Sequence, residues 1–487
     1  MSNLDARSRW LALYVLCLAS LMIVLDVTIV GVALPSIKDD LGFSDTSLAW
    51  VVNAYLLTYG GFLLLGGRLG DLYGHRRLFL IGISVFTVAS LLCGLATSQG
   101  FLVVARSVQG VGGAVASAVS LSLMVNLFTD PGERAKAMGI FGFVAAGGGS
   151  IGVLLGGIIT DLISWHWIFL VNVPIGAFVI LISLRLLPES RLPTASKRLD
   201  IPGAVTVTTA LIIAVYAIVN GNEVGWATFR TLGLLGLSGA LLVTFLFIET
   251  RSSSPLVPLR LLRMRNMATA DVVGVLWAAA MFAWFFMSAL YMQLVLGYSP
   301  LEIGLAFLPA NLIMAALSIG LSAKLVMRFG FRAPLATGLG LAAAGLLLFT
   351  RAPVDGTFVV DILPSMILLG LGAGMAFNPV LMAAMSDVEP SESGLASGVV
   401  NTAFMMGGAL GLAVLASLAA RRTSSLTAQG QSAVAALNGG YHLAFLVGAA
   451  FAVIAAALAA GLLRTRPIAA PAQAEGEAHG ALATQTD

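Results

Sequence analysis

Fourteen hydrophobic stretches, each about as long as a membrane-spanning helix, run through this sequence of 487 residues. The hydrocarbon core of a bilayer is about 30 Å thick, so a helix needs roughly 20 apolar residues to cross it. Hydrophobic residues make up 59% of the chain and charged residues only 10%, which excludes a soluble domain of this length. The sequence therefore predicts an all-α polytopic membrane protein with 14 transmembrane helices. The predicted spans are 10–34, 47–66, 78–96, 100–127, 137–160, 167–187, 202–220, 230–249, 267–291, 303–325, 333–350, 359–380, 395–419 and 441–463.

The positions of the basic residues predict the orientation, because cytoplasmic segments of membrane proteins carry an excess of Lys and Arg. If the N-terminus is inside, 20 of the 26 Lys and Arg lie in cytoplasmic segments, five lie outside, and Arg106 lies within a span. We therefore expect both termini to be cytoplasmic. The few Lys among the basic residues, with the high Ala, Gly and Leu content, indicate the cytoplasmic (inner) membrane of a bacterium. The net charge of +3 reflects this distribution and does not indicate nucleic-acid binding.

Two polar connectors rich in Pro and charged residues, 188–202 and 251–266, divide the chain into six, two and six predicted spans. Glycines in the two six-span blocks align at nearly constant shifts, which indicates an internal repeat. The aligned pairs are Gly82 with Gly338, Gly112 with Gly372, Gly148 with Gly407 and Gly152 with Gly411, at shifts of 256, 260, 259 and 259 residues. Blocks of six spans keep the same orientation, so we expect an axis along the membrane normal with the substrate path between the halves.

The predicted organisation has five parts. They are a cytoplasmic N-terminus (1–9), an N-terminal six-helix bundle (10–188), two linker helices with cytoplasmic connectors (189–266), a C-terminal six-helix bundle (267–465) and a disordered cytoplasmic tail (466–487).

Four motifs carry a family resemblance. Residues 67–77, Gly-Arg-Leu-Gly-Asp-Leu-Tyr-Gly-His-Arg-Arg, resemble the signature loop of the major facilitator superfamily. Residues 106–112, Arg-Ser-Val-Gln-Gly-Val-Gly, resemble its proton-relay motif. Residues 25–35 and 165–176 are similar to patterns of the fourteen-span drug:proton antiporters of the QacA/EmrB type. The resemblance extends from about residue 10 to 465, and it implies a major facilitator fold of two six-helix bundles plus two central linker helices.

The resemblance also implies roles for two groups of residues. The loop after the second span would form a conformational latch, with the residues Gly67, Asp71, Gly74, Arg76 and Arg77. The fifth span would carry the antiporter motif, with the residues Gly148, Gly152, Gly156 and Gly157. Val153 replaces the proline of that motif, so the proline kink is missing.

Asp26 lies deep in the first predicted span, and Arg106 lies within the fourth. An ionised carboxylate at the bilayer centre costs about 2.5–3.5 kcal/mol on insertion scales. Asp26 is tolerated there if it faces a wet cavity, pairs with a cation or stays protonated, and each condition suits a proton carrier. Arg106 stays charged and is expected in the same half of the membrane. There it would modulate the pKa of a nearby acid or order the water that carries the proton. The alternative for both residues is a purely structural role. Asp271, near the start of the ninth span, is expected to be a solvated boundary residue.

The candidate substrate contacts are aromatic and Met side chains together with intramembrane amides. Aromatic and Met side chains suit lipophilic cations. Lipid-facing aromatics and amides that only join helices are the alternatives. The candidates are Asn53, Tyr55, Gln109, Trp277, Met281, Trp284, Tyr291, Asn311, Asn378 and Asn401.

The sequence predicts a proton-coupled antiporter that exports hydrophobic, neutral or monocationic drugs or other xenobiotics by alternating access. A single clear intramembrane acid further predicts a low proton stoichiometry. The alternatives are a dedicated exporter of one endogenous metabolite or antibiotic, and a proton-coupled nutrient symporter. A membrane enzyme is not expected, because the sequence contains no metal-ligand cluster, nucleophile motif or phosphate loop. The expected partners are a small hydrophobic substrate, protons and the lipid bilayer, with no cofactor, no metal and a monomeric state.

Overall fold

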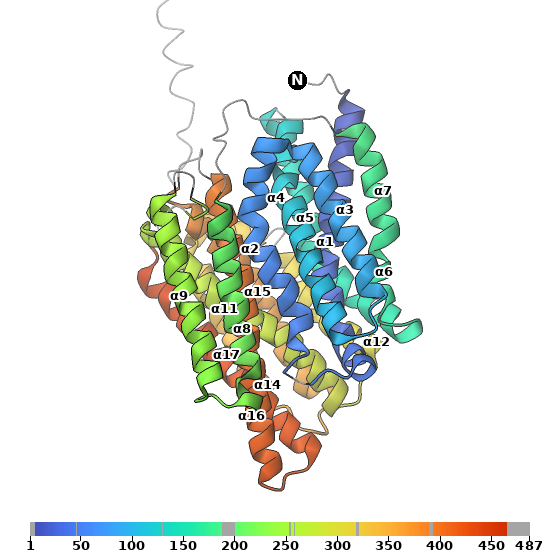
Figure 1. The fold of residues 1–487 in the computed structure, drawn as a ribbon, viewed down its shortest axis with the longest axis vertical. Coiled ribbons are helices and arrows are strands. Elements are labelled where there is room, and N and C mark those ends of the chain that lie inside the picture. Colours follow the sequence, from blue (N-terminus) through green and yellow to red (C-terminus); the bar gives the residue numbers. More distant parts are fainter. Residues whose placement is uncertain are drawn as a thin grey trace, which may run out of the picture.

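The computed structural model describes residues 5–44, 46–128, 130–187, 200–252, 255–257, 259–317, 321–388 and 393–464. The regular elements among these residues are all helices, as the sequence predicts, and they form one elongated bundle (Figure 1). The tail 466–487 and residues 188–199 of the connector 188–202 fall outside the described residues, so their predicted character is not tested.

The N-terminal half begins with α1 (Ala6–Leu41), whose N-cap Asp5 accepts a hydrogen bond from the backbone of Ser8. Gly42 ends this helix in the left-handed region at φ 69°, a conformation that glycine adopts without strain. The following helices are α2 (Ala49–Tyr73), α3 (His75–Gly94), α4 (Gln99–Leu127), α5 (Pro131–Leu162), α6 (Trp167–Leu170) and α7 (Asn172–Leu186).

Two helices, α8 (Ile201–Val224) and α9 (Phe229–Arg251), precede the C-terminal half. That half contains α10 (Leu259–Leu262), α11 (Arg265–Leu290), the π-helical turn η1 (Tyr291–Val295), α12 (Pro300–Ala316), α13 (Ser322–Phe329), α14 (Arg332–Phe349), the π-helical turn η3 (Phe358–Ile362), α15 (Leu363–Met385), α16 (Ser393–Ala428) and α17 (Ala433–Leu462).

The predicted count of fourteen spans is not supported. Within the described part of the chain, 12 helices are long and apolar enough to cross a membrane. The predicted spans 137–160 and 303–325 correspond to shorter apolar helical stretches, Ile151–Leu162 and Pro300–Ala316. The 17 residues of α12 rise only about 26 Å, less than a hydrocarbon core of about 30 Å. Hydropathy alone did not reveal that the helix would be this short.

The helix pairs α3–α4 and α14–α15 pack through glycines that the internal repeat aligns. A methyl group on Gly112 would lie 2.5 Å from the backbone nitrogen of Phe86, and one on Gly82 would lie 2.9 Å from the Gly112 carbonyl oxygen. A methyl group on Gly338 would likewise lie 2.9 Å from the carbonyl oxygen of Gly372. Small residues allow backbones in a membrane to approach this closely. The two halves therefore use the same contact at the aligned positions.

A second contact also recurs. Gly152 of α5 packs against α1, where a methyl group would lie 3.1 Å from the Leu25 carbonyl oxygen. Its aligned counterpart, Gly411 of α16, packs against α11, where a methyl group would lie 2.4 Å from the α-carbon of Ala279. The pairs α1–α5 and α11–α16 are thus equivalent, which supports the internal repeat. The predicted domain boundaries themselves remain predictions.

The halves meet along two seams, α2 against α16 and α5 against α12. One apolar core also joins them, because it contains residues from Ile29 to Ile37 of α1 together with Trp284 to Tyr291 of the C-terminal half. In the predicted orientation these residues lie toward the outer surface. The described structure is therefore closed by apolar packing at its predicted outer end.

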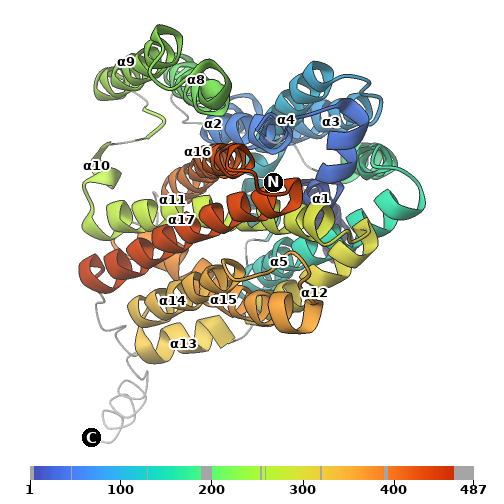
Figure 2. The ribbon, with the colours of Figure 1, turned by 90° about the horizontal axis from the view of Figure 1, so that it is seen from below.

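The helices α8 and α9 lie at the periphery of the bundle, where α8 packs beside α2 and α16 and α9 packs on α8 (Figure 2). Thr208 of α8 packs directly on Gly61 of α2. At the other end of α8, the side-chain amide of Asn222 donates to the carbonyl oxygen of Ser417 at 2.6 Å and to its hydroxyl at 2.9 Å. The helix α8 therefore contacts both halves along the α2–α16 seam.

Candidate functional site

A buried ion pair joins α1 to α4. Asp26 is 0% exposed and Arg106 is 1% exposed. An Nη1 hydrogen of Arg106 points at Oδ2 of Asp26, with 2.5 Å between the two heavy atoms. The residues are 80 positions apart in the chain, and the packing of α1, α2 and α4 brings them together.

Two amides complete the surroundings of Asp26. Gln109 donates through Nε2 to Oδ1 of Asp26 at 2.7 Å, and Asn172 of α7 donates to the same oxygen at 3.1 Å. Both amides also donate to the hydroxyl of Ser90 on α3, at 2.6 and 3.0 Å. Both carboxylate oxygens of Asp26 are therefore hydrogen-bonded, which is what a buried carboxylate requires.

Arg106 is held by four further groups. Its Nε donates to the carbonyl oxygen of Val51 at 3.0 Å, and its Nη1 donates to Oε1 of Gln109 at 2.6 Å. The guanidinium also lies 4.5 Å from the ring centroid of Tyr55 and 5.5 Å from that of Phe169. Cation–π contacts of this kind stabilise a desolvated guanidinium. The planar group thus reaches α1, α2 and its own helix at once, which a lysine ammonium could not do.

This arrangement couples the charge of Asp26 to the packing of four helices. With Asp26 ionised, the pair has no net charge and α1, α3, α4 and α7 are connected through hydrogen bonds. If Asp26 takes up a proton, Arg106 loses its counter-charge while it is still buried. A buried cation without a partner is strongly unfavourable, so protonation favours a rearrangement that rehydrates Arg106.

The sequence prediction identified the pair but not its neighbours. Asn172 belongs to the motif at 165–176, although that motif alone gave it no role. Ser90 lies in an apolar stretch without any motif, so no sequence signal pointed to it. Gln109, a predicted substrate contact, is engaged by Asp26, Arg106 and Ser90 instead.

The predicted latch lies at the junction of α2 and α3. Gly74 joins the two helices at φ 97°, a backbone conformation that side-chain-bearing residues rarely adopt. Arg76 donates to the carbonyl oxygen of Leu184 on α7 at 2.5 Å, within the N-terminal half, and Arg77 is exposed. Gly67 lies in α2, as does Asp71, whose side chain lies outside the described set. Bridging to the C-terminal half therefore remains a prediction.

The antiporter-motif glycines of α5 contact two different neighbours. Gly148, Gly152 and Gly156 pack against α1 between Leu21 and Ile29. Gly157 instead faces α12 of the other half, where a methyl group would lie 2.6 Å from the carbonyl oxygen of Pro300. The motif therefore allows α5 to pack closely against its own half and against the C-terminal half.

We expect the Gly157→Ala variant to open the predicted outer end more often. Overpacking costs about 1–3 kcal/mol in a well-packed contact, and this cost applies only where α5 touches α12. The population should therefore shift about 5- to 150-fold toward states in which the two helices separate. Spin labels at the exposed residues Leu162 and Leu305 would report the separation by distance measurements. Gly31→Ala is the matched control, because a methyl group there meets nothing within 4 Å. An unchanged distance distribution for Gly157→Ala would contradict the prediction.

Some of the predicted substrate contacts are fully buried and others are only partly buried. Asn53, Asn311, Trp277 and Trp284 are buried, and each has side-chain polar atoms without a hydrogen-bond partner: both amide atoms of Asn53, Nδ2 of Asn311 and Nε1 of each tryptophan. Tyr55 is buried against Arg106. Tyr291 donates to the carbonyl oxygen of Pro353 at 2.7 Å, while Met281 and Asn378 are partly buried.

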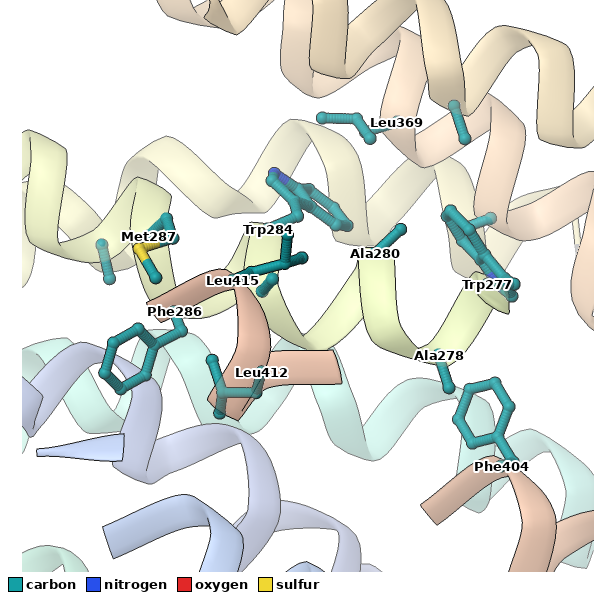
Figure 3. Packing of buried hydrophobic residues seen from close by; sticks show 14 of the residues in the cluster. Trp277, Ala278, Ala280, Trp284, Phe286, Met287, Leu369, Phe404, Leu412 and Leu415 are labelled. Atoms are coloured by element: carbon teal, nitrogen blue, oxygen red, sulfur yellow. The ribbon is translucent and has the colours of Figure 1, made fainter. Parts of the chain in front are cut away.

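Residues along α11 pack against different neighbouring helices. Trp284 lies on the side of α11 where Leu369 of α15 lies, whereas Ala278 lies beside Phe404 of α16 (Figure 3). Trp284 also contacts Phe307 of α12, with 6.2 Å between ring centroids. Most of these aromatic residues therefore belong to the apolar core, which differs from the lipid-facing position that the sequence analysis gave as the alternative.

Two expectations about burial are wrong. Asn401 was expected inside the bundle, but it is exposed and its amide donates to Ser397 one turn earlier on α16. Asp271 was expected to be solvated, but it is only 8% exposed because α15, α16 and α17 surround α11. Distance from a predicted helix end does not determine whether neighbouring helices cover a residue.

The comparison with protein families identifies the class of this protein. The profile of the Major Facilitator Superfamily matches residues 16–412. The chain belongs to this superfamily. Its membership explains the two equivalent halves, and the predicted family is confirmed at this level. The predicted fourteen-span subgroup within this superfamily is not confirmed.

This major facilitator protein is similar to proteins that confer antibiotic resistance or export antibiotics. It is 41% identical over 448 residues to the puromycin resistance protein pur8 of Streptomyces alboniger, covering 91% of this chain and 88% of that protein. It is 38% identical over 424 residues to the cephamycin export protein CmcT of Amycolatopsis lactamdurans, covering 86% of each. It is 36% identical over 418 residues to the lincomycin resistance protein of Streptomyces lincolnensis, covering 85% of each.

Solved structures show the same fold. A bacterial homologue of the human lysosomal transporter Spinster, inward-facing and unoccupied, matches with a TM-score of 0.66 at 16% identity, covering 93% of this chain and 97% of that one. An auto-inhibited peptide transporter of the POT family also matches with a TM-score of 0.66 at 16% identity, covering 94% and 99%. At such identities the likeness concerns the fold alone.

Proposed function

We propose that this protein is a proton-coupled efflux transporter that exports hydrophobic, neutral or monocationic drugs from the cytoplasm of a bacterium. The buried Asp26–Arg106 pair carries the proposal, because it combines a protonatable group with a fixed charge inside the transport fold. The similarity to resistance and export proteins over at least 85% of the chain supports the outward direction.

The proposed cycle alternates between two states of the halves. A proton that enters from outside protonates Asp26, which frees Arg106 and favours release of the substrate outward. Deprotonation toward the cytoplasm restores the ion pair and the substrate affinity. One charge moved across 100 mV supplies about 2.3 kcal/mol before any pH gradient is counted, which is sufficient to bias a two-state equilibrium.

The proposal includes a topology. The full length of α5, 32 residues, rises about 48 Å, so α5 can cross a bilayer. Together with α12, it would bring the number of spans to fourteen, the QacA/EmrB arrangement. Both termini would then be cytoplasmic and the transporter would act as a monomer.

A dedicated exporter of one compound is the second candidate. The names of several relatives, among them the puromycin, cephamycin and lincomycin proteins, each refer to a single antibiotic. Another relative, 35% identical over 414 residues, is the multidrug resistance protein Stp of Mycobacterium tuberculosis. The breadth of the substrate range therefore distinguishes the two candidates.

Transport by the purified protein in proteoliposomes with an imposed pH gradient tests the proposal. We expect lipophilic cations and neutral drugs to trigger proton movement that is absent from protein-free vesicles. Transport of one compound in a broad panel would favour the dedicated exporter. Accumulation of a compound in the same direction as the protons would identify a symporter and contradict the proposal, as would substrate movement that ignores the pH gradient.

A further inference from the structure

A second carboxyl group inside the membrane domain has no role in the coupling site. Both oxygens of Asp271 on α11 are buried and have no hydrogen-bond partner. Among the carboxylates whose side chains the structure describes, no other has both oxygens in this condition. Arg265, the basic residue on the same helix, donates its Nε to the carbonyl oxygen of Leu462. Among the described residues none compensates an ionised carboxylate at this position, so the site attracts a positive charge.

Space for a ligand adjoins this carboxyl group. Gly274 follows Asp271 by three residues on the same face of α11 and is buried, yet a methyl group there would meet nothing within 4 Å. The glycines of α16 that face α11 differ, since a methyl group on Gly407 would lie 2.8 Å from the α-carbon of Val275. The packing of α11 is therefore tight toward α16 and open beside Asp271.

An apolar stripe continues along the helix from Gly274. At helical spacing, Asp271 and Gly274 are followed by Ala278, which is fully buried, and by Met281 and Phe285, which are partly buried. Phe404 of α16 lies beside Ala278 (Figure 3), and its ring centroid is 6.1 Å from that of Phe282. Aromatic and Met side chains suit a lipophilic cation, because they combine apolar packing with attraction for positive charge.

Asp26 cannot take this role in the described state. Its carboxylate already accepts hydrogen bonds from Arg106, Gln109 and Asn172, and Arg106 neutralises its charge. A cation would have to displace a guanidinium that is held in place by Val51 and two aromatic rings. The charge that attracts a cationic substrate must therefore come from elsewhere.

We propose that Asp271 binds the positive charge of a lipophilic monocation, whose apolar body lies along the α11 stripe of Gly274, Ala278, Met281 and Phe285. This inference rests on the proposed function and narrows its substrate class. The two halves then have different roles. The N-terminal half carries the proton at Asp26, and the C-terminal half selects the charge of the substrate at Asp271.

Binding to the full-length protein in detergent, at one fixed pH, tests this assignment. The probes are tetraphenylphosphonium, a permanent lipophilic monocation, and triphenylphosphine oxide, a neutral molecule of similar shape. We expect Asp271→Asn to weaken tetraphenylphosphonium binding about tenfold or more, and to leave triphenylphosphine oxide binding within about twofold. Asp271→Glu, which keeps the charge, should recover part of the loss. Asp161→Asn, which removes an exposed carboxylate, is the matched control and should bind both probes as the wild type does.

The neutral probe separates a folding defect from a loss of charge recognition. Equal binding of tetraphenylphosphonium by the wild type and Asp271→Asn would overturn the assignment, and so would an equal loss of both probes. A wild type that binds and transports only the neutral probe would also overturn it while leaving efflux intact. A wild type that binds neither probe would count against the proposed function itself, and the assignment would fall with it.

Discussion

Asp26→Asn should reduce substrate-triggered proton movement to the level of protein-free vesicles. The amide cannot carry a proton through the cycle, and its NH2 group would replace an oxygen that accepts from Arg106 at 2.5 Å. Coupling should therefore disappear although the side chain keeps its volume. The measurement is proton flux in proteoliposomes, with and without a transported compound.

Two variants make this result interpretable. Asp39→Asn changes the same residue type at an exposed position of the same helix, so it should transport as the wild type does. The double variant Asp26→Asn/Arg106→Gln removes both charges and should be well folded, yet it should also lack proton coupling. Substrate-triggered proton movement that persists in Asp26→Asn would show that the proton carrier lies elsewhere.

Arg106→Gln should cause the largest loss of stability among the substitutions considered. Removing one partner of a buried ion pair typically costs about 3–5 kcal/mol, because the other charge stays buried without compensation. Here the substitution would also remove the donor to the carbonyl oxygen of Val51 and the contacts with the rings of Tyr55 and Phe169. A thermal unfolding series in detergent would measure the effect as a lower unfolding temperature.

The double-mutant cycle distinguishes a true pair from two independent contacts. If Asp26 and Arg106 compensate each other, Asp26→Asn/Arg106→Gln should be more stable than Arg106→Gln alone, because no unpaired charge remains. If the two single losses simply add in the double variant, the pair has no energetic coupling and the proposed role of Arg106 is wrong. Arg106→Lys should recover only part of the stability, since an ammonium cannot reach Val51, Gln109 and Asp26 together.

Local sequence patterns predicted the helices well because membrane helices satisfy their own backbone hydrogen bonds. Apolar length is a local feature, and the structure contains helices at the apolar stretches that the sequence analysis identified. The number of spans depends on where each helix ends, and hydropathy did not resolve this point for α12.

For the candidate site, the sequence identified some residues and the structure was needed for the others. A carboxylate and a guanidinium in apolar helices are conspicuous in any sequence, so Asp26 and Arg106 were identified and the structure brings them together. Ser90 and Asn172 belong to the same network, but they lie 82 residues apart and a buried Ser or Asn resembles any helix-joining residue. The environment of Asp271 depends on α15, α16 and α17, none of which is adjacent to it in sequence.

The sequence by itself determined the class of the protein, its two repeated halves and the intramembrane charges of Asp26 and Arg106, because these follow from hydrophobicity, spacing and residue type. Only the tertiary structure decided which groups each charge meets. Asp26 has a guanidinium and two amides around it, whereas Asp271 has no partner for either oxygen. The cost of a charge in a membrane depends on its neighbours within a few ångströms, and helix packing brings these neighbours from distant parts of the chain.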